Sequence, residues 1–210
     1  MRALLLLIAL AALWLGGVAR AAVVSTPAEA DVGLPFWCDW SYDWEARCYR
    51  DDGPRLPIGG VDDKVWRAAL RFPLGSIPSG AAISSAEVSI YHDGTCVAPR
   101  LVAVPCAAGY VVDAHRILSP TWSREREPDF DERVVATAVV IAAGTPQWLT
   151  WDVTALVRAW HRSAPPNNGL LLKLQDGDEV YGSSGPYGPS ASSPDVALRP
   201  RLVVHYAPAG

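Results

Sequence analysis

The sequence predicts an all-β protein: an antiparallel, jelly-roll-like β-sandwich with one short helix, following a cleaved signal peptide. Three observations support this prediction. Segment 64–74 alternates apolar and polar residues with a period of two, which is typical of a strand with one buried face. Shorter segments of this kind are separated by Gly- and Pro-rich turns, as in sandwiches and barrels. Only segment 151–160 has clear helical periodicity.

Residues 1–21, "MRALLLLIALAALWLGGVARA", have the pattern of a secretory signal. Arg2 precedes an apolar run that is too short to span a membrane, and Ala19-Arg20-Ala21 is a small-x-small cleavage site. We therefore expect a secreted, extracellular protein without membrane insertion. Removing Arg2 and Arg20 changes the net charge from −4 to −6. A mildly acidic chain is a poor partner for nucleic acid or an anionic membrane.

The remaining chain is long enough for one domain with a substantial core. We expect residues 22–54 to form a leader and a Trp-rich segment, and residues 55–208 to form the sandwich domain. The leader, up to about Gly33, is expected to be loose because its residues are small and polar.

The cysteines are Cys38, Cys48, Cys96 and Cys106. An even number in a secreted chain predicts disulfides, and three connectivities are open. We favour the local pairs Cys38–Cys48 and Cys96–Cys106, because each pair brackets a turn-rich segment. A zinc site is the alternative, but the two-residue spacing of zinc motifs is missing.

The clearest strand is Lys64–Leu74, in which Trp66, Ala68, Leu70, Phe72 and Leu74 point inward while Arg67 and Arg71 point outward. Ser85–Tyr91 is a second alternating strand, with Ala86, Val88 and Ile90 inward. Shorter strands are expected near 101–105, 110–112, 116–118, 134–141, 147–152, 169–174, 179–184 and 201–206.

The segment "WDVTALVRAW" (151–160) predicts a short helix that bridges two strands. Asp152 and Thr154 are both able to cap its start, and Val153, Leu156, Val157 and Trp160 share one stripe. Asn168-Gly169 then predicts a turn into the next strand. We expect Trp160 to close an open end of the sandwich, which is a structural role.

These motifs, in the order "RAALRFPL…IPSGAAISSAEVSIY…WDVTALVRAW…NNGLLLKL…RPRLVVHY", resemble the DNRLRE domain over roughly Leu56–Pro208. The resemblance implies a secreted β-sandwich module related to carbohydrate-binding modules and to disaggregatase-related surface repeats. The chain departs from the family pattern at Pro73, where Asp is usual, and the Asp-Asn-Arg-Leu-Arg-Glu string behind the name is absent.

Catalytic and metal-binding patterns are weak. Glu125 and Glu127 lie in the charge run "REREPDFDER", which is typical of a solvated loop, and the four histidines lack metal-ligand spacing. "DGDE" (176–179) and "VDDK" (61–64) offer carboxylates for a structural calcium, but neither has a complete ligand pattern. We therefore predict that the protein is not an enzyme and has no cofactor, with structural calcium as the alternative.

Eight residues are candidates for ligand binding, because aromatic rings stack on sugars and Arg binds carboxylates in bidentate fashion. They are Arg67, Arg71, Tyr91, Trp122, Tyr181, Tyr187, Arg201 and His205. If the first long strand and the last strand share a sheet, their Arg and His side chains form one basic surface, which Tyr91 joins.

Together these features predict a secreted, non-catalytic carbohydrate-binding module whose partner is a polysaccharide or cell-wall component. A structural or adhesive surface protein that binds a protein or wall partner is the alternative. An unrecognised lyase or hydrolase is a third hypothesis, and it requires a cleft with paired acid and base groups.

Overall fold

A computed structural model describes residues 21–35, 39–40, 46–47, 55–61, 64–98, 102–123, 127–179 and 185–209. Within these ranges the protein is all-β, with antiparallel sheets and one short α-helix, as predicted. No helix in the described ranges has the length and apolar character needed to cross a bilayer.

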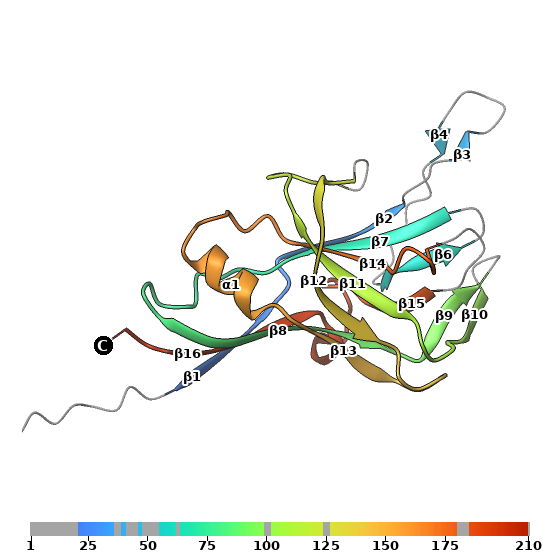
Figure 1. The fold of residues 1–210 in the computed structure, drawn as a ribbon. Coiled ribbons are helices and arrows are strands. Elements are labelled where there is room, and N and C mark those ends of the chain that lie inside the picture. Colours follow the sequence, from blue (N-terminus) through green and yellow to red (C-terminus); the bar gives the residue numbers. More distant parts are fainter. Residues whose placement is uncertain are drawn as a thin grey trace, which may run out of the picture.

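Two sheets form the body of the molecule (Figure 1). The four-stranded sheet has the order β1 (Ala22–Pro27), β16 (Arg201–Ala207), β8 (Ala82–His92) and β13 (Gln147–Asp152). The six-stranded sheet has the order β12 (Phe130–Val139), β11 (Val111–Ile117), β14 (Leu170–Leu174), β7 (Lys64–Arg71) and β2 (Ala30–Pro35), and β6 (Gly59–Val61) also pairs with β7.

A smaller sheet lies at the end of the molecule opposite helix α1 (Thr154–His161) (Figure 1). Its order is β10 (Val102–Pro105), β9 (Thr95–Ala98), β15 (Gly185–Pro189) and β5 (Arg55–Pro57). The remaining elements are the paired strands β3 (Asp39–Trp40) and β4 (Ala46–Arg47), and a 3-10 turn, Val196–Leu198.

The predicted disulfide Cys96–Cys106 is present and connects β9 to the residue that follows β10. Both cysteines are fully buried, so the bridge closes this hairpin inside the protein. The predicted pair Cys38–Cys48 lies outside the described residues.

The inner faces of the two large sheets pack against each other and form the core. Ala86, Val88 and Ile90 of β8 are buried, as predicted from their alternation. Trp151 of β13 is completely buried, and its indole Nε1 donates a hydrogen bond to the Val112 carbonyl of β11, at 2.9 Å. This bond joins the two layers and satisfies a donor that would otherwise be costly to bury.

Helix α1 packs against β8 with the predicted apolar stripe. Val157 and Trp160 are buried, which confirms the expected position of both side chains. The N-cap residue is Val153, whose side chain makes no capping bond, but the predicted Asp152 does accept a hydrogen bond from the Thr154 amide of the first turn, at 2.9 Å. The Thr154 hydroxyl in turn accepts a hydrogen bond from the Ala86 amide, at 2.9 Å, and so ties the helix start to β8.

The segment expected to be a loose leader forms two strands. β1 pairs with β16 along its whole length, and β2 pairs with β7. Val24 packs against the main core and Val32 is 5% exposed, so each strand contributes an apolar side chain. The residues beside Val24 and Val32 are mostly small, so the apolar–polar alternation of these two strands could not be recognised in the sequence.

We predict that Gly169→Ala destabilises the fold by about 2 kcal/mol or more. Gly169 has a φ of +105°, and an added Cβ would lie 2.5 Å from the Leu70 carbonyl oxygen of the neighbouring strand. Gly75→Ala is the matched control, because no atom lies within 4 Å of its added Cβ. Chemical denaturation of both variants measures the difference, and equal stabilities would contradict the prediction.

Candidate functional site

The sandwich has two outer faces, and six of the eight candidate residues are divided between them, while Tyr187 lies on β15 of the small sheet. Arg67 and Arg71 lie on β7 of the six-stranded sheet, whereas Arg201 and His205 lie on β16 of the four-stranded sheet. The predicted single basic surface is therefore wrong, because the first long strand and the last strand do not share a sheet.

On the outer face of the six-stranded sheet, the central strands β11, β14 and β7 are covered by the protein's own chain, whereas much of the edge strand β12 is exposed. Val32, Ala69, Ile117 and Leu171 form a second buried apolar cluster there. Trp122, from the connection between β11 and β12, and Phe130, at the start of β12, pack against this cluster. We call this surface the closed face.

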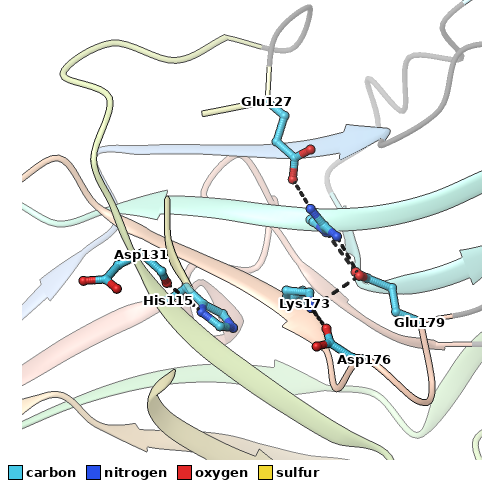
Figure 2. A network of polar contacts seen from close by, with 7 residues as sticks. His115, Glu127, Asp131, Lys173, Asp176 and Glu179 are labelled. Atoms are coloured by element: carbon cyan, nitrogen blue, oxygen red, sulfur yellow. Dashed lines mark hydrogen bonds and ion pairs between the residues drawn. The ribbon is translucent and has the colours of Figure 1, made fainter. Parts of the chain in front are cut away.

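Arg67 occupies the centre of the closed face. Its guanidinium donates to the Glu179 carboxylate through Nε (2.9 Å) and Nη2 (2.7 Å), and to Glu127 through Nη1 (2.5 Å). Figure 2 shows Glu127 and Glu179 approaching this guanidinium from different connections. Arg67 also lies over the Phe130 ring, at 5.5 Å.

Burial by itself lowers the pKa of the Arg67 guanidinium, but the hydrogen bonds and charges of Glu179 and Glu127 outweigh it. The pKa therefore lies above its ordinary value, and Arg67 stays charged. Such a cation holds two loops together, and all three of its donor groups have acceptors within the protein.

Lys173 extends this network on β14. Its ammonium pairs with Asp176 and lies 3.5 Å from a Glu179 oxygen, and its side chain is 6% exposed (Figure 2). The hydrogen bond and charge of Lys173 lower the pKa of Asp176. Two acids of the "DGDE" segment are therefore already matched by cations of the protein. No group of three or more potential metal ligands occurs within the described ranges.

His115 is a buried member of the closed face that sequence inspection did not single out. Its ring is 3% exposed, Nδ1 donates to the Asp131 carbonyl at 2.9 Å, and Phe130 meets it edge to face at 5.3 Å. A single histidine between Ala114 and Arg116 carries no recognisable ligand spacing, so only the structure identifies it.

Three further candidates are held by contacts within the protein. Arg71 donates to Glu29 at 2.7 Å and lies 5.7 Å from the Trp122 ring. Trp122 donates from Nε1 to the Asn168 carbonyl, at 2.8 Å. Tyr187 packs against Trp66 and lies under the guanidinium of Arg55, at 4.5 Å. Tyr181 lies outside the described residues.

No loop among the described residues covers the outer face of the four-stranded sheet in this way, and we call it the open face. Its side chains come from alternate positions of β1, β16, β8 and β13, which the strand register places side by side. They are Val23, Ser25, Pro27, Ser85, Glu87, Ser89, Tyr91, Trp148, Thr150, Asp152, Arg201, Val203 and His205. Val23 is 60% exposed, and Glu87 and His205 are also exposed.

Arg201, Trp148 and Tyr91 form a cluster on the open face, the Arg201 cluster. Tyr91 and Trp148 are partners across β8 and β13, and their rings meet edge to face at 5.4 Å. The Arg201 guanidinium lies over the Trp148 ring at 4.0 Å, which is within cation–π range. Trp148 was not a candidate, although the inward Trp151 three residues later implies that it points outward.

The guanidinium of Arg201 is held by stacking rather than by hydrogen bonds. No hydrogen bond or ion pair of its side chain is found among the described residues, and its covered Nε lacks an acceptor. The Arg201 cluster therefore presents a fixed cation whose outer donors are available to a partner, unlike the donors of Arg67.

We predict that Arg67→Ala destabilises the protein by roughly 2–3 kcal/mol, because two carboxylates lose the cation that compensates them. The value lies below that of a fully buried pair, since a tenth of the Arg67 side chain is exposed. Arg133→Ala is the control, because that arginine also binds an aspartate but is 85% exposed, and we expect no measurable change. Urea unfolding distinguishes the two, and a neutral Arg67→Ala would contradict the structural role of the network.

Comparison with known proteins identifies a family. The model of the TGF-beta propeptide family matches residues 54–187, almost two thirds of the chain. A curated relative, "Protein DVR-1 homolog" from Strongylocentrotus purpuratus, is 24% identical over 168 residues, which cover 76% of this chain and 33% of the relative. The chain thus spans about a third of the length of that relative.

The match overturns the resemblance to the DNRLRE domain, because residues 54–187 include most of the motifs on which that resemblance rested. Those motifs are inward-facing strand residues, turns and the helix stripe around α1. Antiparallel sandwiches with a bridging helix need such residues whatever their ancestry, and this explains why the motifs indicated the wrong family.

Proposed function

Because the chain belongs to the TGF-beta propeptide family, we propose that it is the propeptide part of a secreted growth-factor precursor and associates with a growth factor domain. The family match carries this proposal, since it covers strands of both large sheets and helix α1. The geometry supports it as well: one outer face is closed by loops of the protein, while the other presents Arg, Trp and Tyr side chains.

Two predictions from the sequence are confirmed by the family. The protein is secreted, and it is not an enzyme, because TGF-beta propeptides are extracellular parts of signalling-factor precursors without catalytic function.

The predicted carbohydrate-binding function is wrong, and so is the alternative of an adhesive surface protein. Propeptides of the matched family associate with a growth factor domain rather than with polysaccharides or cell-wall components. Aromatic and Arg side chains on a sheet face suit protein partners as well as sugars, and residue type alone could not separate the two.

Several finer features remain part of this proposal. We propose that residues 1–21 are a signal peptide removed after Ala21, and that Cys38 and Cys48 form a disulfide in segment 22–54. We further propose that residues 55–208 form most of the domain and that β1 and β2 complete its two large sheets. Its two layers are then of jelly-roll type, and it needs no cofactor. Mass spectrometry of the secreted, non-reduced protein tests the first two points directly.

We predict that the folded chain binds a mature growth factor. Mature TGF-beta immobilised on a biosensor should give saturable binding with the oxidised chain Ala22–Gly210. The same chain after heat denaturation is the control, because a docking surface made from four strands is lost on unfolding. Absence of saturable binding by the folded chain would contradict the proposed function.

A further inference from the structure

We infer that the open face is the docking surface for the growth factor domain, and that Arg201 binds a carboxylate of that partner. This inference rests on the proposed function and gives it a location. The occupant is a polypeptide segment with an acidic side chain opposite Arg201.

The first argument is that the two outer faces differ in the hydrogen-bond donors that are available to a partner. On the closed face, Arg67 has acceptors for its Nε, Nη1 and Nη2 within the protein, and Trp122 uses its indole donor. On the open face, the Arg201 side chain makes no hydrogen bond or ion pair to any described residue. A partner that needs a cation with available donors finds it on the open face.

The second argument is the rigidity of the Arg201 cluster. Stacking on Trp148 at 4.0 Å fixes the plane of the guanidinium, and Tyr91 fixes Trp148 through its edge-to-face contact. A guanidinium held in one orientation loses little freedom when a carboxylate binds its two outer donors. Arg, Trp and Tyr are also the residue types that dominate binding energy at protein interfaces.

The third argument is charge complementarity. Val203 pairs with Glu87, and Arg201 lies two residues before Val203 on β16, so Arg201 and Glu87 are diagonal neighbours on the same face. Glu87 is exposed, and the exposed Asp152 lies opposite it on β13 of the same face. A cation and an anion side by side select a partner segment with an acidic group opposite Arg201 and a basic group opposite Glu87.

The test measures binding of immobilised mature TGF-beta by the oxidised chain and three variants. Arg201→Gln removes the charge, and Arg201→Lys keeps the charge but removes the planar fork and much of the stacking. Arg133→Gln is the matched control, because it removes one exposed positive charge from β12 of the other sheet. Thermal unfolding checks that each variant is folded.

We expect Arg201→Gln to raise Kd at least about tenfold and Arg201→Lys to raise it by a smaller factor, while Arg133→Gln stays within about twofold of the parent. The Kd of the parent chain should also rise with salt more steeply than that of Arg201→Gln, since one ion pair is missing in the variant.

Each other outcome overturns the inference in a recognisable way. If the parent binds and Arg201→Gln binds equally well, the docking surface lies elsewhere while the proposed function stands. If Arg133→Gln weakens binding as much as Arg201→Gln, the effect comes from net charge and not from this cluster. If the folded parent does not bind at all, both the proposed function and the docking surface are wrong.

Discussion

Burial of β14 on both of its faces is the constraint from which the rest of the structure follows. All five of its residues, Leu170 to Leu174, are buried. Leu170, Leu172 and Leu174 point into the main core, so Leu171 and Lys173 must point to the other side of the sheet. On that side the apolar Leu171 requires apolar groups to cover it, whereas the Lys173 ammonium requires carboxylates.

The closed face supplies both kinds of cover. Trp122 and Phe130 pack over the apolar cluster that contains Leu171, while Asp176 and Glu179 compensate Lys173. Arg67 then joins Glu179 to Glu127 and so connects the two loops that provide the cover. Because a buried charge without a partner is costly, these loops are fixed by electrostatics as much as by packing. The central part of this face, over β14 and β7, therefore presents little surface to a second molecule, and the exposed part of the sheet is the edge strand β12.

Local patterns predicted the parts of the fold that depend on one strand or one helix. The alternation of β8, the stripe of α1 and the Cys96–Cys106 bridge could all be read from neighbouring residues. The sheet to which a strand belongs is not a local property. Since β7 and β16 each alternate equally well in either sheet, the sequence could not show that Arg71 and Arg201 lie on opposite sides of the sandwich.

The prediction of the candidate site residues failed for the same reason, because their exposure and partners are set by tertiary contacts. Arg67 points away from the main core, as its alternation with Ala68 indicates, yet it is 8% exposed because loops from distant parts of the chain cover it. Trp148 belongs to the candidate site because the Arg201 guanidinium stacks on its ring. Arg201 is 53 positions later in the sequence, and the pairing of β16 with β8 brings the two residues together. Outward orientation is therefore predictable from a strand, but exposure and partners depend on tertiary contacts.

The segment matched by the family model contributes differently to the closed face and to the open face. Residues 54–187 include β6, β7, β11, β12 and β14, and with them the whole Arg67 network of the closed face. The open face takes only β8 and β13 from the matched segment, because β1 precedes it and β16 follows it. The stack of Arg201 on Trp148 crosses this boundary, since Trp148 lies within the match and Arg201 beyond it. The family framework thus builds the rigid layer and the aromatic platform, whereas the cation that a partner would meet comes from a strand that the match does not reach.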